Sequence, residues 1–159
     1  MNIDWVDLFL KPSGRIGQKE FLIGIVILIA LNIVLGLVLP RDGAISLIIN
    51  LLLIYPGYCV LSSRFRDMGK APWLAMLPYG LIGLGYVLML VGVLGMAGGA
   101  AAGSEAGVGG GLLGAGLGVM LAGIGGIIGL IFFIWGALAK GDEGTNAYGP
   151  PPGDPTAKA

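Results

Sequence analysis

Four long apolar stretches dominate the chain, and short polar segments separate them. They run from residues 21 to 39, 44 to 61, 73 to 94 and 112 to 138, and none contains Asp, Glu, Lys or Arg. About 20 mostly apolar residues in a helix can cross the hydrocarbon core of a bilayer, and a charged residue at the helix centre would cost about 2.5–3.5 kcal/mol. The pattern therefore predicts four transmembrane helices over these ranges.

The two ends of the chain predict further segments. Within residues 1–20, apolar side chains recur at near-helical spacing: Ile3, Val6 and Leu10. Pro12 limits a helix to the first dozen residues, which is typical of a short helix lying in the membrane interface. Residues 140–159 are rich in glycine and proline, which favours an extended or disordered tail. The expected fold is an all-α integral membrane protein: a bundle of four transmembrane helices, residues 21–139, with a short N-terminal interfacial helix.

Composition supports the membrane class, and the placement of charge predicts orientation. Only 11% of the 159 residues are charged, whereas a soluble domain carries about 25%. Eight of the nine Lys and Arg residues fall in the N-terminal segment, the connection at residues 62–72 and the tail, and only Arg41 falls on the other side. Because cytoplasmic segments are enriched in Lys and Arg, both termini and this connection are expected to be cytoplasmic.

Glycine is concentrated around the connection between the third and fourth stretches. Residues 95–111 are mostly Gly and Ala with one Ser and one Glu, which predicts a flexible linker on the non-cytoplasmic side. Small residues then recur at every fourth position: Gly110, Gly114, Gly118, Ala122 and Gly126. Small residues on one face allow helix backbones to approach closely in lipid. We interpret these five as a packing face, within the bundle or between protomers.

The residue types present restrict the chemistry. The chain has one cysteine, Cys59, and no histidine, which excludes the usual zinc sites and Ser-His-Asp or Cys-His catalysis. Asp67 and Glu20 could in principle act as a carboxylate pair, but no nucleophile or metal-ligand set accompanies them. We therefore expect no catalytic residue, no metal, no cofactor and no nucleic-acid partner, and we expect that the protein is not an enzyme.

Three polar motifs flank the apolar stretches: GRIGQKEF at 14–21, RFRDMGKAPW at 64–73 and GTNAYGPPP at 144–152. In order and content they resemble the small bacterial inner-membrane proteins catalogued as domain of unknown function 805. The residues that carry the resemblance are Gly14, Arg15, Glu20 and Phe21, then Arg64, Asp67, Gly69, Lys70 and Trp73, then Gly144, Asn146, Tyr148, Gly149 and Pro150. The chain departs from the family pattern at Gln18, Leu22, Ser63, Arg66, Leu74 and Pro151. The resemblance implies a location in the bacterial inner membrane and no established activity.

All three motifs are expected on the same, cytoplasmic side of the membrane. Orientation needs only Lys and Arg, so acidic, amide and aromatic residues in these motifs indicate a further role. We expect the motifs to meet in a polar cluster: Arg15, Glu20, Arg64, Arg66, Asp67, Lys70, Asn146 and Tyr148. An arginine would pair there with Glu20 or Asp67, and the turn at 146–150 would fold back onto the cluster. Such a cluster could hold the helix ends together, bind anionic lipid headgroups, or bind a protein or a small ligand.

Two classes of function remain. The first is a structural or interaction protein of the inner membrane, with the lipid bilayer and a second copy or another membrane protein as partners. The alternative is an oligomeric transporter or channel, or a lipid-binding membrane protein. Transport commonly needs polar groups at mid-membrane, and the spans offer Asn32 and Asn50, which hydrogen bonds to neighbouring helices would equally explain. A water-filled cavity that reaches either residue would favour transport.

Overall fold

The computed structural model describes residues 4–38 and 44–153, and in the second range it describes side chains from residue 48 on. The described residues are mostly helical. Their elements are α1 (Trp5–Leu10), α2 (Gln18–Val38), α3 (Ala44–Asp67), the 3-10 helix η1 (Pro72–Ala75), α4 (Met76–Ala101) and α5 (Glu105–Leu138). The described residues form no β-strand and contain one isolated β-bridge. Four helical segments are long and apolar enough to cross a membrane, which confirms the predicted all-α class.

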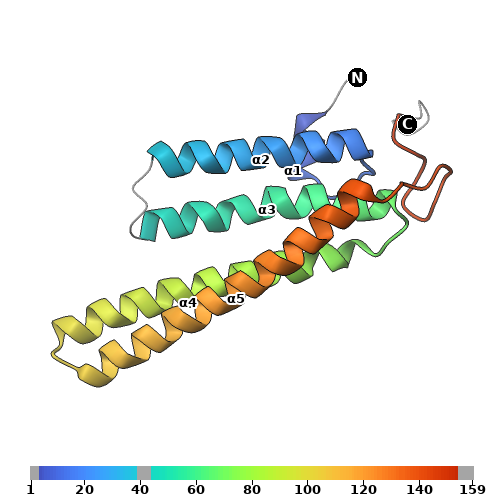
Figure 1. Ribbon diagram of the computed structural model, residues 1–159. Coiled ribbons are helices and arrows are strands. Elements are labelled where there is room, and N and C mark those ends of the chain that lie inside the picture. The colour runs from blue at the N-terminus through green and yellow to red at the C-terminus, as the bar shows by residue number, and fades with distance from the viewer. Residues whose placement is uncertain (1–3, 39–43, 154–159) are drawn as a thin grey trace.

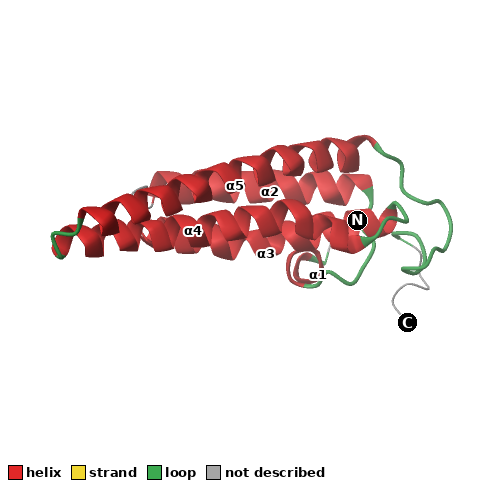
Figure 2. Cartoon of the chain, turned by 90° about the horizontal axis from the view of Figure 1, so that it is seen from below, coloured by secondary structure: helices red, strands yellow, loops and turns green. Residues whose placement is uncertain are grey.

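The four long helices form two antiparallel hairpins, α2–α3 and α4–α5 (Figure 1). The short helix α1, the connection from α3 to η1 and the residues after α5 gather at one end of the molecule, which we call the cap end. The turn between α4 and α5 lies at the opposite end, and both views show it reaching farther from the cap end than α2 and α3 (Figures 1 and 2).

The buried core lies close to the cap end. It consists of one connected set of apolar side chains: Leu8, Ile16, Phe21, Val60, Leu61, Phe65, Met68 and Ala75. The Phe65 ring packs on α5, with its centroid 5.3 Å from that of Phe132 and 5.5 Å from that of Trp135. Farther from the cap end the helices expose large apolar side chains such as Ile33, Leu52 and Ile127. An outer surface of this kind suits contact with lipid.

Helix α1 lies against α3, as both the core contacts and Figure 2 show. The Asp4 carboxylate begins the helix by accepting from the backbone N–H groups of Val6 and Asp7, both at 3.1 Å. Leu8 is buried, while Trp5, Val6 and Leu10 are at least half exposed. An exposed apolar face on a short helix fits the predicted place in the interface.

The glycine-rich residues 95–111 differ from the sequence prediction, because they form helix rather than a flexible linker. Helix α4 runs to Ala101, α5 begins at Glu105, and Gly103 makes the turn with a φ of +63°. The Ser104 N–H donates to the Gly99 carbonyl at 2.8 Å, and the Ser104 hydroxyl accepts from the Gly107 N–H at 3.1 Å. The first contact ends α4 and the second begins α5.

Helices α4 and α5 pack through glycines spaced by seven residues. The buried glycines at this contact are Gly85, Gly92 and Gly99 on α4 and Gly111, Gly118 and Gly125 on α5. A Cβ atom at Gly85 would lie 2.6 Å from the Gly118 carbonyl oxygen, and one at Gly118 would lie 2.5 Å from that of Gly85. Seven residues correspond to about two helical turns, so this spacing keeps one seam in contact along the hairpin.

The predicted face with a spacing of four residues is only partly at this seam. Gly118 and Ala122 lie at the contact with α4, and a Cβ at Gly114 would lie 3.5 Å from the Gly92 Cα atom. Gly110 and Gly126 instead have open space where a Cβ would stand. Each step of four residues turns about 40° around a helix of 3.6 residues per turn, so the four steps from Gly110 to Gly126 cannot stay on one contact line.

Candidate functional site

The candidate site is the polar end of the bundle, where α3 stops. We call it the polar cap and define it by these side chains: Arg15, Arg64, Arg66, Asp67, Asp142, Asn146 and Tyr148. Helix α3 ends in a glycine turn, in which the Lys70 N–H donates to the Phe65 carbonyl at 2.8 Å and Gly69 has a φ of +64°. This favours glycine at position 69, and it leads the chain away from the last turn of α3, which holds Arg64 and Asp67.

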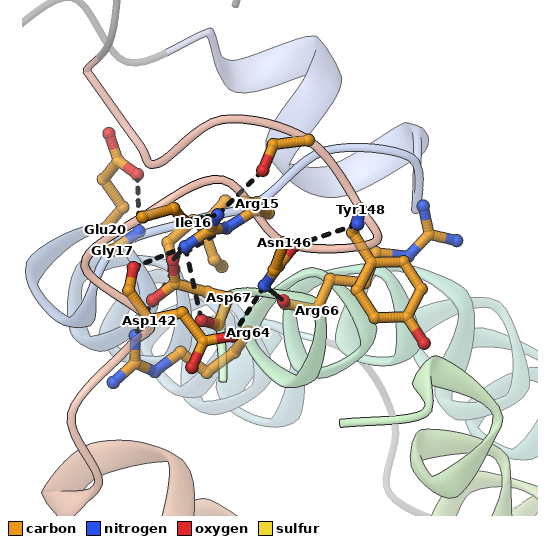
Figure 3. A network of polar contacts seen from close by, with 12 residues as sticks. Arg15, Ile16, Gly17, Glu20, Arg64, Arg66, Asp67, Asp142, Asn146 and Tyr148 are labelled. Carbon is orange, nitrogen blue, oxygen red and sulfur yellow. Dashed lines mark hydrogen bonds and ion pairs between the residues drawn. The ribbon is translucent and has the colours of Figure 1, made fainter. Parts of the chain in front are cut away.

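Asp67 is at the centre of the polar cap (Figure 3). Its Oδ1 accepts from Arg15 Nε at 3.3 Å and from Arg15 Nη2 at 3.1 Å, and its Oδ2 pairs with Arg64 Nη1. All three side chains are at most 4% exposed. One buried carboxylate therefore serves two guanidinium groups, which reach it from α3 and from the segment before α2.

Arg15 uses its other donors to hold the tail. Its Nη1 donates to the carbonyls of Gly144 and Gly149, both at 2.8 Å, and its Nη2 donates to the Asp142 carbonyl at 2.7 Å. A guanidinium has five N–H donors. With the two bonds to the Asp67 carboxylate, these contacts match each donor of Arg15 with an acceptor.

Arg64 binds the end of α5. Its Nε donates to the Gly136 carbonyl at 2.9 Å and its Nη2 donates to the Ala139 carbonyl at 2.5 Å. Its Nη1 makes a longer contact of 3.5 Å with the Ile16 carbonyl in addition to the Asp67 pair. The last carbonyls of a helix have no partner within the helix and carry its negative dipole end. The buried Arg64 cation therefore satisfies and stabilises the C-terminus of α5.

The tail folds back onto the end of α3 through Asn146. Its Nδ2 donates to the Arg66 carbonyl at 2.9 Å and to Asp142 Oδ2 at 2.8 Å, while its Oδ1 accepts from the Tyr148 N–H at 2.9 Å. The Arg66 guanidinium lies 5.6 Å from the centroid of the Tyr148 ring, a cation–π distance. Arg66 Nη1 also donates to the Ser13 carbonyl at 2.9 Å. These contacts attach residues 142–149 to the end of α3.

Two of the predicted cluster residues lie outside this network. Glu20 accepts from the Gly17 N–H at 3.0 Å at the start of α2, and the side chain of Lys70 is exposed. The structure brings together the other six: Arg15, Arg64, Arg66, Asp67, Asn146 and Tyr148. Of the acid partners considered for the arginines, Asp67 forms the pairs, because Glu20 is engaged with its own helix terminus.

Asp142 and several residues that contact the polar cap carry no clear signal in the sequence. Gly136 and Ala139 contribute only backbone carbonyls, and a Cβ atom at Gly141 would collide with the Asp67 carboxylate. Asp142 donates its N–H to the Asp67 carbonyl at 2.8 Å. Its position just after the last apolar stretch and four residues before Asn146 is the one pattern that could have indicated its role.

We expect Gly141→Ala to lower the free energy of unfolding by about 1–3 kcal/mol, since an added methyl group must displace a packed group. The group displaced here is the paired Asp67 carboxylate. Gly144→Ala is the matched control, because a Cβ at Gly144 meets nothing within 4 Å. Thermal unfolding of the purified protein in detergent measures both. Equal melting temperatures for the two variants would contradict the close approach of residue 141 to Asp67.

The polar cap is built for internal contacts more clearly than for reaction chemistry. Within residues 4–38 and 44–153, no group of three or more His, Cys, Asp or Glu side chains could hold a metal ion. Its single buried carboxylate is neutralised by two arginines. The arrangement can join chain segments and can carry charge into a dry environment, because each charge has a partner.

Comparison with known proteins agrees with the three motifs. No curated protein and no solved structure matches the chain. The model of the family described as "Protein of unknown function (DUF805)" matches residues 9–150. This range runs from α1 through the four long helices to the tail, and it includes Arg15, Asp67 and Asn146. The chain therefore belongs to the DUF805 family, whose function is unknown.

Proposed function

We propose that this protein is a structural or interaction protein of the bacterial inner membrane, in which the polar cap holds the two helical hairpins together. The observation that supports this most directly is the use of the buried arginine donors. Arg15 directs all of its donors to acceptors within the chain. A ligand anion would have to displace one of these bonds, and removing a partner from a buried charge costs several kcal/mol. This favours joining segments over binding a small anion.

The connections made by the polar cap also support a structural role. Arg64 on α3 binds the end of α5, so it links the first hairpin to the second. Arg15 links the segment before α2 to the tail. Asp67 pairs with both arginines, and these two links therefore form one unit. A bundle joined in this way offers a fixed surface for another membrane protein or for a second copy.

The proposed location places the polar cap in the cytoplasm. Eight of the nine Lys and Arg residues fall within residues 1–20, 62–72 and 140–159 of the sequence, and positive residues near membrane spans are retained on the cytoplasmic side. Lys70 and Lys140 are exposed there. Each such cation can attract anionic lipid by about 1 kcal/mol, so the inner leaflet is a second partner. No catalytic step and no cofactor form part of this proposal.

Purification from native membranes tests the proposal. We expect the wild type to carry a stable protein partner or a second copy, and to give no ion or solute flux above protein-free vesicles after reconstitution. Asp67→Asn should weaken that association, because it removes the charge that joins both arginines. The control is Lys70→Ala, at an exposed position, with quantification of the co-purified lipids.

The outcomes separate the candidate functions. Flux from the folded wild type would contradict the structural proposal and favour a transporter or channel. Loss of anionic lipid in Lys70→Ala, with no protein partner in any sample, would favour a lipid-binding protein instead. An association that Asp67→Asn leaves unchanged would show that the polar cap is not needed for it.

A further inference from the structure

The second hairpin is too long for a bilayer. Helix α5 has 34 residues, and at about 1.5 Å per residue it is about 51 Å long, against a hydrocarbon core of about 30 Å. Helix α2, with 21 residues, is about 31 Å long and fits. Even at a tilt of about 40°, near the upper limit for transmembrane helices, α5 would span about 39 Å along the bilayer normal. About 9 Å or more of α5 therefore lies outside the hydrocarbon core.

The exposed side chains show at which end of the hairpin α5 extends beyond the hydrocarbon core. At the cap end, large apolar residues remain exposed on α5 as far as Leu138, which is 76% exposed. At the other end they stop at Leu94 on α4 and begin again at Leu112 on α5, which are 59% and 61% exposed. We call residues 95–111, which lie between these two, the tip. The residues exposed there are glycines, alanines and Glu105, and such a surface gains little from contact with lipid.

The tip is held in order by contact between its two helices. Glycine disfavours a helix by about 1 kcal/mol per residue relative to alanine, so this segment needs support from packing. A Cβ at Gly99 would lie 2.5 Å from the Val108 nitrogen and 2.6 Å from the Gly107 carbonyl carbon. The two backbones are therefore in direct contact, and the turn at 102–104 closes them with the cap bonds of Ser104.

We propose that the tip is an ordered helical projection into the aqueous compartment opposite the polar cap. The proposal goes beyond the proposed function, because it concerns the other end of the protein and does not depend on Asp67. It combines three observations: the excess length of α5, the change from large to small exposed residues at Leu94 and Leu112, and the backbone contact between Gly99 and Gly107. The projection presents small side chains and a single charged residue, Glu105, to that compartment.

Cysteine labelling tests where the tip lies. In a Cys59→Ala background, single cysteines are placed at exposed positions of the tip (Ala102→Cys and Ala106→Cys), of the apolar surface (Val91→Cys and Leu117→Cys) and of the tail (Thr145→Cys). A membrane-impermeant maleimide is added to intact cells. We expect the tip cysteines to react about tenfold or more faster than the apolar-surface pair, since only the thiolate reacts and hydrocarbon disfavours it. Thr145→Cys should react only after the membrane is opened.

A second measurement tests order. A spin label on Ala106→Cys should give the restricted motion of a helix surface rather than the fast motion of a loop. Tip cysteines that react as slowly as Leu117→Cys in membranes, but fully in detergent, would place the tip in lipid and contradict the proposal. Fast spin-label motion would contradict the ordered projection. Neither result would alter the stability effects expected at the polar cap, so each proposal can be contradicted without the other.

Discussion

Asp67→Asn should lower the free energy of unfolding by about 3–5 kcal/mol, because removing one partner of a buried ion pair leaves the other charge uncompensated. The effect is expected to be large here because the side chain is nearly fully buried and pairs with both Arg15 and Arg64. Asparagine has the same shape as aspartate but is neutral, and its amide nitrogen would face guanidinium donors. Denaturant titration in mixed micelles, followed by tryptophan fluorescence, gives the change in free energy.

The matched control is Asp7→Asn, which makes the same chemical change in an exposed pair. Asp7 and Lys11 are 2.8 Å apart with side chains more than half exposed, and exposed pairs contribute about 0.2–1 kcal/mol. If Asp67→Asn cost no more than Asp7→Asn, the polar cap would not be holding the bundle together. A large loss for Asp67→Asn that Arg15→Ala and Arg64→Ala do not share would contradict the pairing itself.

Gly92→Ala should weaken the second hairpin by about 1–3 kcal/mol, the usual cost of adding a methyl group to a packed contact. A Cβ at this position would collide with the backbone of Ala115 and lie 2.6 Å from the Gly111 carbonyl oxygen. Backbone atoms cannot move aside as a flexible side chain can, so the two helices would have to separate. The same unfolding titration measures the loss.

Gly98→Ala lies on the same helix and should have the opposite sign. A Cβ there meets nothing within 4 Å, and alanine favours a helix over glycine by about 1 kcal/mol. The contrast between the two substitutions separates contact with α5 from helix propensity. Stabilisation by both would show that α4 and α5 are not in backbone contact at Gly92.

The membrane-spanning helices could be predicted because charge is absent from long ranges of the chain. Their ends were harder to place, since α3 continues through the charged residues Arg64 and Asp67 and α5 begins within the glycine-rich region. A charged residue in the last turn of a helix is compatible with a span when other segments bury and neutralise it. Glycine opposes a helix in isolation but allows the closest packing of two, and the sequence does not show which effect prevails.

The candidate site was predictable in its side chains and not in its backbone contacts. Asp67 and Asn146 could be selected because polar residues with no role in orientation recur on one side of the predicted membrane, and Arg15 because it lies in one of the same three motifs. The carbonyls that the arginines bind, such as those of Gly136 and Gly149, can come from any residue type. Their positions follow only from the way α5 and the tail pack against α3, which depends on the whole fold.

The bonds between Arg64 and the end of α5 also constrain the order of events during synthesis. Arg64 and Asp67 enter the membrane region with the first hairpin, whereas the Gly136 and Ala139 carbonyls are made about 70 residues later, several seconds at about 5–20 residues per second. Through that interval Arg64 lacks these two acceptors, although its pair with Asp67 lies within the first hairpin and can already form. A nascent chain that stops before Asp142 therefore cannot complete the network.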